Sequence, residues 1–331
     1  MKRTLISRAL AAGVGLVLAP AVFGEGAVKV DEGLPAYAAA ETVSGNVKSV
    51  GSDTMNNLMT LWAEEFQKFH RSVRVEIEGK GSSTAPPALI EGSATFGPMS
   101  REMKSAEQDE FEKAYGYKAV ALRTGIDMLA LYVHKDNPIR GLTMQQVDAI
   151  FSKTRKGGYA SEIRTWGDLG LTGEWANRPI TLYGRNSASG TYGFFKENAL
   201  FKGDFKDSVK EQPGSSAVVS SVAGDLGGIG YSGIGYKTAD VHALAIGEST
   251  DALVAATPEN AYTGEYPLAR FLWVYVNYKP GSALDPLRRE FIKLVFSRQG
   301  QEVVVKDGYF PVTARLAKVE LGKVGIDAGN P

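Results

Sequence analysis

The chain has 331 residues, and its 37 basic residues (Lys and Arg) equal its 37 acidic residues (Asp and Glu) in number. This balance argues against a nucleic acid or an anionic membrane as a partner recognised by bulk charge, so any anion site must be local. The absence of cysteine excludes disulfides, thiolate metal sites, a cysteine nucleophile and a lipid-modified N-terminal cysteine. With only three histidines we expect no metal and no cofactor, and the length favours two domains.

The N-terminus has the pattern of an export signal. Basic residues precede a short apolar run, residues 9–23, which is interrupted by a proline and is too short for a typical membrane helix. Small residues at the spacing of a cleavage site occur at residues 22–24 and again at residues 36–40. We favour the second position because ordered-looking sequence begins near Val43. We therefore assign residues 1–40 to a signal peptide and leader, and expect an exported, periplasmic protein.

Strands alternate with helices in the first part of the chain. We predict strands at 47–50, 73–77 and 95–99. Three helices are predicted beside them: one that follows the 51–54 loop and ends at Phe69, one with Pro86 near its start, and one at 106–114. Such alternation indicates a parallel sheet, whose ligands bind beyond the carboxyl ends of the strands. Polar loops fall at three such ends: Gly51–Thr54, Gly79–Thr84 and Ser100–Arg101. One polar loop would be commonplace, but three in succession favour a binding site.

Two long β-type runs divide the rest of the chain. Tyr117–Lys135 is too long for one ordinary strand, and Pro267–Tyr278 is a second such run. We interpret them as crossings between two domains with a cleft between them. Domain 1 would comprise residues 41–128 and 265–331, and domain 2 residues 129–264. Further helices are predicted at 143–151, 215–223, 286–296 and 299–305.

The stretch Thr181–Leu200 has the pattern strand, polar loop, helix. Ser189 is a suitable N-cap, and Gly190 lies in the first helical turn. A helix N-terminus presents unpaired N–H groups and partial positive charge, so it is well suited to bind an anion. No carboxylate occurs within Gly184–Phe195, and further donors come from Arg185, Ser187, Ser189 and Thr191. An ordinary capped helix would explain this stretch alone about equally well, but the polar loops of the first domain favour an oxyanion site.

Two other functions are considered. Gly228, Gly230 and Gly233 match a dinucleotide fingerprint, but no helix-forming run follows them, so we favour close backbone packing in a strand. A secreted serine hydrolase would need Ser83 or Ser189 as its nucleophile, yet no serine lies in G-x-S-x-G. We therefore expect no enzyme, and keep the hydrolase as the alternative from a different class.

Several motifs resemble those of the phosphate-binding proteins of bacterial ABC importers. They occur in that family's order between Val47 and Val312: GSDTM at 51–55, GKGSS at 79–83, GIDMLALYVHKDNP at 125–138, TWGDLG at 165–170 and RNSASGT at 185–191. The last of these motifs is the most specific. The resemblance implies an α/β, type II (Venus-flytrap) periplasmic-binding-protein fold with two crossovers. It also implies a monomer that buries phosphate in its cleft and delivers it to a membrane permease. Matched motif by motif, the ligand groups would be Thr54, the Met55 N–H, Ser82, Arg185, Ser189, Gly190 and Thr191.

One position departs from the family pattern. The best-known members place an aspartate just beyond the third strand, where it accepts the proton of phosphate and repels sulfate, whereas this chain has Ser100 followed by Arg101. We include both residues in the predicted site, with sulfate or another tetrahedral oxyanion as the near alternative ligand. Asp53 could supply an acceptor instead, although we favour it as the cap of the helix that follows.

Overall fold

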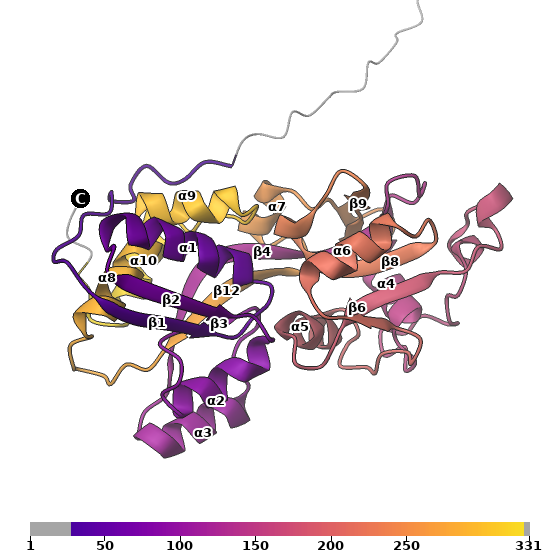
Figure 1. The fold of residues 1–331 in the computed structure, drawn as a ribbon. Helices are drawn as coiled ribbons and strands as arrows, with labels where there is room; N and C mark the ends of the chain where they lie inside the picture. Colours follow the sequence, from indigo (N-terminus) through magenta and orange to yellow (C-terminus); the bar gives the residue numbers. More distant parts are fainter. Residues whose placement is uncertain (1–27, 328–331) are drawn as a thin grey trace, which may run out of the picture.

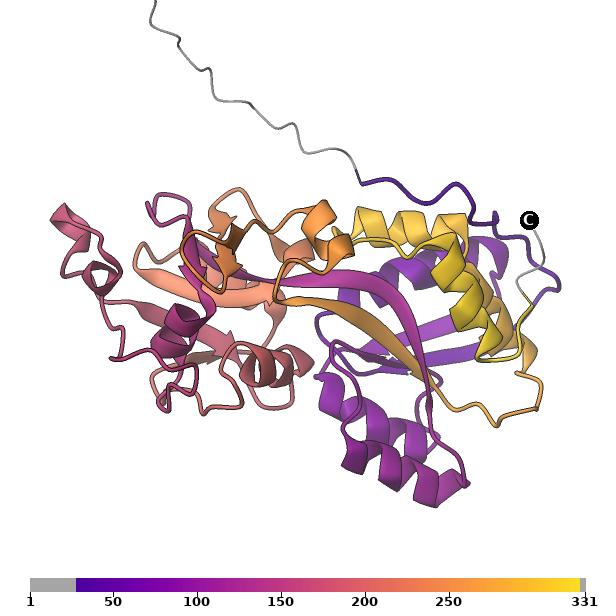
Figure 2. The ribbon, with the colours of Figure 1, turned by 180° about the vertical axis from the view of Figure 1, so that it is seen from behind.

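The computed structural model describes residues 28–327, so residues 1–27 of the predicted signal peptide lie outside the described part. Two lobes lie side by side, and β4 (Val120–His134) and β12 (Ala269–Val276) run between them (Figures 1 and 2). Each lobe has its own hydrophobic core, which makes them two domains. No helix among residues 28–327 is long and apolar enough to cross a membrane.

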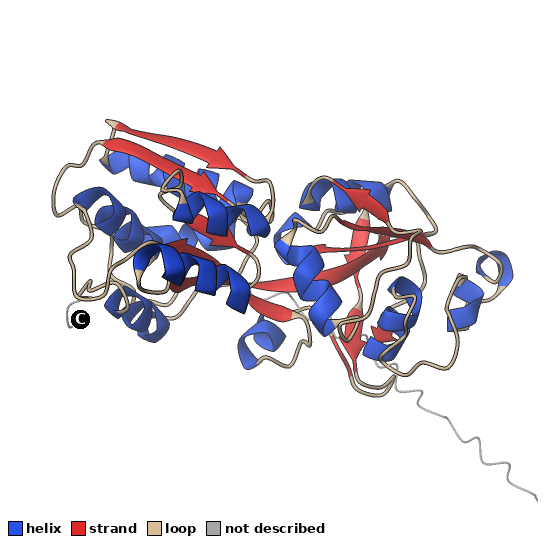
Figure 3. Ribbon diagram, turned by 90° about the horizontal axis from the view of Figure 1, so that it is seen from below, coloured by secondary structure: helices blue, strands red, loops and turns tan. Residues whose placement is uncertain are grey.

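β4 pairs with a different partner in each domain. Over Val120–Met128 it is antiparallel to β12, and over Leu129–Val133 it is antiparallel to β8 (Gly228–Gly233). The change of partner falls beside the boundary predicted at residue 128. Two crossings were predicted from the length of the β-type runs, and the structure contains both, as the view from below shows (Figure 3).

Domain 1 combines strands from the first part of the chain with helices from both ends. Its elements are β1 (Gly45–Val50), α1 (Asn56–Phe69), β2 (Val73–Glu78), η1 (Ser82–Thr84), α2 (Ala85–Ile90), β3 (Gly97–Met99), α3 (Ser105–Tyr115), α8 (Pro286–Val295), α9 (Arg298–Lys306) and α10 (Ala314–Gly322). The aromatic face of α1 lies in the core at Trp62 and Phe66, which are fully buried, and Phe66 packs on Phe291 of α8. Phe69, at the end of the helix, is 39% exposed. The pair α2 and α3 lies apart from the other helices, on the opposite side of the strands (Figure 1).

The prediction of a parallel sheet is confirmed for β1 and β2, and the segment that leads into β3 is also parallel to β1. β1 and β2 are parallel neighbours, whereas β3 is antiparallel to the returning strand β12. A parallel bridge between Ser49 and Phe96 joins this edge to β1, and backbone hydrogen bonds support it, for example from the Val50 N–H to Phe96 O (3.2 Å). The antiparallel neighbour is present because β12, which comes from the far end of the chain, inserts between β3 and β4.

Domain 2 is built from one continuous segment. Its elements are β5 (Gly141–Thr143), α4 (Met144–Phe151), η2 (Trp166–Leu169), η3 (Gly173–Trp175), β6 (Thr181–Arg185), α5 (Gly190–Asn198), β7 (Lys210–Gln212), α6 (Ser215–Ala223), β8, η4 (Ile234–Tyr236), β9 (Val241–Ala243), β10 (Ala245–Gly247), β11 (Leu253–Val254) and α7 (Pro258–Thr263). β6 lies between β7 and β8 and is parallel to both, so its carboxyl end points the Arg185 loop towards domain 1. The glycines of β8 allow close packing: a Cβ at Gly230 would lie within 3 Å of Val218 and Val222 of α6.

Residues 28–43 pack along domain 1, and we call them the N-terminal strap. Leu34, Tyr37 and Val43 are buried in the domain 1 core. Tyr37 Oη donates to Glu290 Oε2 (2.8 Å) and lies 2.6 Å from His70 Nε2. The expectation that ordered sequence begins near Val43 is therefore wrong, because two of these core side chains precede it. The packing favours cleavage near residues 22–24 over cleavage near residues 36–40.

Candidate functional site

The predicted loops of the two domains meet where the N-terminus of α5 faces domain 1. Thr54 Oγ1 lies 2.8 Å from Thr191 Oγ1 across the cleft. A Cβ added at Gly190 would lie 2.2 Å from Ser82 Oγ and 2.7 Å from Ser100 Oγ, so the backbone of α5 approaches the loops of domain 1 very closely. The structure thus brings together predicted site residues that are far apart in the sequence.

The wall formed by domain 1 is a cluster of buried serines. Ser52 Oγ donates to Ser100 Oγ (3.0 Å), and Ser82 Oγ lies 3.3 Å from Ser100 Oγ and accepts from the Ser100 N–H (3.0 Å). All three serines are buried. Buried hydroxyls need partners, and hydroxyls can turn to donate to an anion.

The wall formed by domain 2 is the first turn of α5. Ser189 is the N-cap, as predicted, and its Oγ accepts from the N–H groups of Thr191 (3.1 Å) and Tyr192 (3.4 Å). Because these bonds use the acceptor side of the oxygen, the Ser189 hydroxyl proton is available to a ligand. The first turn contains no acidic residue, so nothing offsets the partial positive charge of the helix N-terminus.

Arg185, at the end of β6, is buried beside this turn with its side chain 2 % exposed. Nη1 donates to Ser215 Oγ (2.8 Å) and lies 3.1 Å from Asp53 Oδ2, and Nη2 donates to Pro213 O (3.3 Å). Burial lowers the pKa of Arg185, and the Asp53 carboxylate opposes this effect. Nε has no partner among the described residues although it is buried. An unpaired buried donor is costly, so this N–H needs an acceptor that a bound anion would provide.

Asp53 does not cap its own helix, so that interpretation is wrong. The N-cap of α1 is Met55 and carries no side-chain cap. Asp53 Oδ2 instead accepts from the N–H of Ser215 (2.8 Å), the first residue of α6 in domain 2. A carboxylate of one domain therefore binds the N-terminus of a helix in the other. Met55 itself is buried, and its N–H donates to Ser52 O (3.3 Å).

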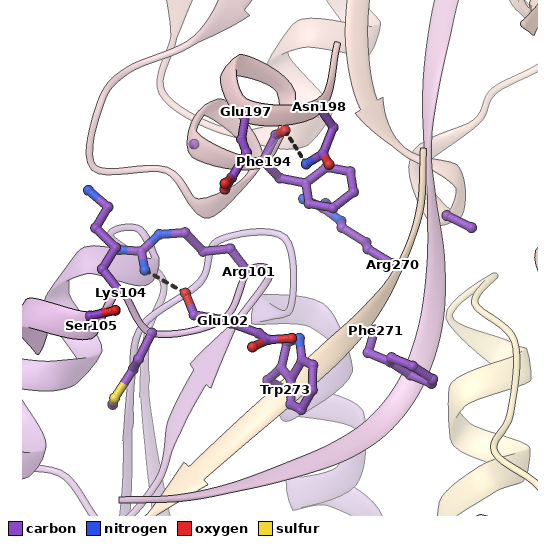
Figure 4. A pocket seen from close by; sticks show the side chains of 13 residues that line it. Arg101, Glu102, Lys104, Ser105, Phe194, Glu197, Asn198, Arg270, Phe271 and Trp273 are labelled. Atoms are coloured by element: carbon purple, nitrogen blue, oxygen red, sulfur yellow. Dashed lines mark hydrogen bonds between the residues drawn. The ribbon is translucent and has the colours of Figure 1, made fainter. Parts of the chain in front are cut away.

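Arg101 is the predicted site residue that the structure directs elsewhere. Its guanidinium pairs with Glu107, at 2.6 Å between Nη2 and Oε1 and 2.7 Å between Nη1 and Oε2. It lines an open cavity of about 680 Å³ between the domains, shown in Figure 4, rather than the hydroxyl cluster. The helix α3 that follows supplies the carboxylate, Glu107, that holds the Arg101 side chain in this position.

Three residues of the site were not predicted. Ser215 is the first residue of α6, after the N-cap Gly214, so the predicted helix start at this serine is the signal that could have identified it. Ser52 lies within the GSDT loop, two residues before the predicted Thr54. Arg270 donates to Thr191 Oγ1 (3.0 Å) from the start of β12, and no local sequence pattern indicates it.

The site is therefore made of hydroxyls, buried guanidinium groups and a helix N-terminus. No group of three or more His, Cys, Asp or Glu side chains within the described residues could hold a metal ion. Together with two domains joined by two strands, these features define a solute-binding protein of the two-domain kind, with a site suited to a small oxyanion.

Comparisons with known proteins agree with this class. Residues 36–299 match the family model described as a PBP superfamily domain. The chain is 56% identical over 318 residues to the phosphate-binding protein PstS of Pseudomonas aeruginosa, covering 96% of both chains. The chain belongs to the PBP superfamily and, within it, to the family of that PstS protein.

Solved structures show the same fold. One is a substrate-binding protein from Clostridium perfringens, described as part of a phosphate ABC transporter and solved with bound phosphate. It matches with a TM-score of 0.69 and 28% identity, over 81% of this chain and 100% of the other. A phosphate transport receptor from Vibrio cholerae matches with a TM-score of 0.62 over 80% of this chain and 100% of the other, and at 21% identity it supports the fold alone.

Proposed function

We propose that this protein is exported to the periplasm, captures inorganic phosphate between its two domains and delivers it to the permease of an ABC importer. It acts as a monomer and without catalysis. The relatives support the ligand and the transport role, since their names and titles specify phosphate and phosphate transport.

The observation that carries the proposal is the buried Arg185 at the end of β6, in the strand-to-helix connection that leads to α5. Its Nε–H is unpaired among the described residues, and it lies in the same cluster as hydroxyls from both domains. A tetrahedral oxyanion has enough acceptor oxygens to satisfy a guanidinium group, several hydroxyls and helix N–H groups at once. Asp53, which contacts both Arg185 and the Ser215 N–H, is the candidate acceptor for a phosphate proton.

Calorimetric titration of the mature chain, stripped of ligand, with phosphate, sulfate and molybdate tests the ligand. We expect phosphate to bind most tightly. Arg185→Ala should weaken phosphate binding by roughly tenfold or more, because a charged hydrogen bond is lost and buried partners are left bare. The control is Arg164→Ala, since Arg164 is an exposed arginine of domain 2 whose side chain pairs with Glu162.

Two results would contradict the proposal. Tighter binding of sulfate or molybdate than of phosphate would show that phosphate is not the ligand. An unchanged phosphate dissociation constant for a folded Arg185→Ala variant would show that Arg185 does not contribute to the site. Incubation of the same sample with an activated ester tests the absence of catalysis. Turnover above that of buffer would support the hydrolase alternative.

A further inference from the structure

A buried ion pair lies where the two crossing strands face each other. Arg270 of β12 is the register partner of Asp127 of β4. Arg270 Nε and Nη2 donate to Asp127 Oδ2 at 2.9 and 2.8 Å, and Asp127 Oδ1 accepts from the Ile234 N–H at 3.0 Å. Both side chains are almost completely buried, at 3% and 0% exposure. A buried ion pair is a poor source of stability compared with apolar packing, so its place between the domains calls for another explanation.

The remaining donors of Arg270 reach both walls of the cleft. Nη1 donates to the carbonyl oxygen of Ser100 in domain 1 (2.9 Å), and Nη2 donates to Thr191 Oγ1 in domain 2 (3.0 Å). The guanidinium also lies 5.2 Å from the ring centre of Phe194 on α5, as the close view shows (Figure 4). One side chain fixed on a crossing strand therefore contacts a predicted site residue on each side.

The direction of these hydrogen bonds controls what the hydroxyls can do. Thr191 Oγ1 accepts from Arg270 Nη2, and Ser215 Oγ accepts from Arg185 Nη1. Thr54 Oγ1 contacts both hydroxyls, at 2.8 Å for Thr191 and 3.4 Å for Ser215. Three hydroxyl protons thus serve two contacts within the group, which leaves one proton to be donated outwards. Each arginine donates to a hydroxyl oxygen and so occupies a lone pair that could otherwise accept a hydrogen bond from a ligand. The hydroxyl group left over therefore acts towards a ligand as a donor.

We propose that Arg270 is a positioning residue of the anion site: held by Asp127, it fixes Thr191 as a hydrogen-bond donor and joins the Ser100 loop to α5 in the closed cleft. This inference rests on the proposed function and deepens it. It explains why the ion pair sits on the crossing strands, where neither domain alone can complete its contacts.

The role predicts a specific dependence on the charge of the ligand. Without Arg270, the free lone pair of Thr191 Oγ1 can accept a proton from a phosphate O–H. The monoanion, which has more protons to donate, should then lose less affinity than the dianion. A purely structural role would instead weaken binding of both forms equally.

The test is phosphate titration of the full mature chain and its Arg270→Gln variant at mildly acid and mildly alkaline pH. We expect Arg270→Gln to lose roughly tenfold in affinity, with the greater loss at alkaline pH, where the dianion dominates. Arg270→Lys keeps the charge but cannot donate as a fork to Asp127, Ser100 and Thr191 at once, so its affinity should be intermediate. The double variant Asp127→Asn/Arg270→Gln leaves no unpaired charge, and serves if the single variant does not fold.

A matched control is Arg123→Gln. Arg123 lies on β4, the other crossing strand, and likewise pairs with a buried carboxylate, Glu320, whose charge keeps Lys323 as a second partner. Phosphate affinity of this variant should be unchanged. Equal dissociation constants for Arg270→Gln and the natural chain, or an equal loss at both pH values, would overturn the inference. Failure of the natural chain itself to bind phosphate would instead refute the proposed function.

Discussion

Gly190 is a position at which the two domains approach each other closely, and an alanine there should interfere with closure. The added Cβ would lie 2.2 Å from Ser82 Oγ, although alanine is a better helix former than glycine and should not harm α5. We expect Gly190→Ala to weaken phosphate binding by roughly tenfold or more while the melting temperature stays level or rises. Calorimetry and thermal unfolding on the same sample measure both.

The control for this variant lies one turn further along the same helix. A Cβ at Gly193 would meet the flexible Arg101 side chain at 3.3 Å, which can move aside. Gly193→Ala should therefore bind phosphate as the natural chain does. Phosphate binding by Gly190→Ala as tight as that of the natural chain would show that the loops of domain 1 can move away from α5. The close approach of the two domains at Gly190 would then not be required for binding.

Ser100 gives a prediction about selectivity. Its hydroxyl accepts from Ser52 and lies beside Ser82, so this part of the site presents no carboxylate to repel sulfate. We expect the natural protein to reject sulfate less strongly than Ser100→Asp does, because an unpaired acceptor against a sulfate oxygen is destabilising. Competition of sulfate against bound phosphate measures this. If the natural protein excludes sulfate as severely as the variant, Asp53 is the residue that reads the phosphate proton.

At the scale of elements, the sequence predicts the features that depend on residues close together in the chain. Ser189 and Gly190 specify the start of α5, because a cap and its helix are neighbours in the chain. Asp127 and Arg270 could not be paired in advance, since the register of two strands far apart in the sequence depends on the tertiary fold. Asp53 follows the same rule: its partner, the N–H of Ser215, belongs to another domain.

The N-terminal strap shows a second limit. Leu34 and Tyr37 lie in an irregular segment without helical or strand periodicity, so the sequence gives no sign that they belong to a core. A chain that begins at residue 41 should lose both side chains from domain 1, at a cost of about 2 kcal/mol or more each. We expect a clearly lower melting temperature than for a chain that begins at residue 25, and mass spectrometry of the exported protein should place its N-terminus near residue 25. An N-terminus near residue 41, or equal melting temperatures, would contradict the role of the strap.

His70 should make the strap sensitive to acid. Tyr37 Oη donates its proton to Glu290, so His70 Nε2 must donate to Tyr37, while Nδ1 accepts from the Val43 N–H (3.3 Å). A second proton on Nδ1 would face that amide. Burial lowers the pKa of His70, although the charge of Glu290 acts in the opposite direction.

The sign of the pH effect follows from this shift. Below the ordinary histidine pKa of about 6.5 the unfolded chain binds a proton that the native chain does not, so the free energy of unfolding falls as pH falls through this range. In His70→Gln the slope of stability against pH should be shallower, even if the variant is less stable throughout. Urea unfolding at a series of pH values measures the slope. An unchanged slope would show that His70 is protonated equally in both states.

At the scale of the whole molecule, contacts across the cleft hold a closed arrangement. Ser83 Oγ donates to Ala188 O (3.0 Å), and Tyr236 Oη lies 3.2 Å from Asp53 O and 3.1 Å from Thr54 O. Because ligand groups come from both domains, binding and closure should be one linked equilibrium.

Small-angle scattering with and without saturating phosphate tests this linkage. We expect the radius of gyration to fall on binding in the natural protein, and to fall less in Gly190→Ala, whose closure is obstructed. The same radius in both states of the natural protein would mean that the site is complete within one domain.

The insertion of β12 between β3 and β4 also sets the order in which the protein can mature. Domain 2 is a continuous segment, so all its strands are available once the chain has emerged as far as β11. Domain 1 must wait for β12 and for α8 to α10, since its sheet and core are unfinished without them. Domains generally fold as units, with the part that emerges first ahead. The half of the site that carries Arg185 and α5 is thus assembled early, and the serine wall that completes it is the last part of the protein to become functional.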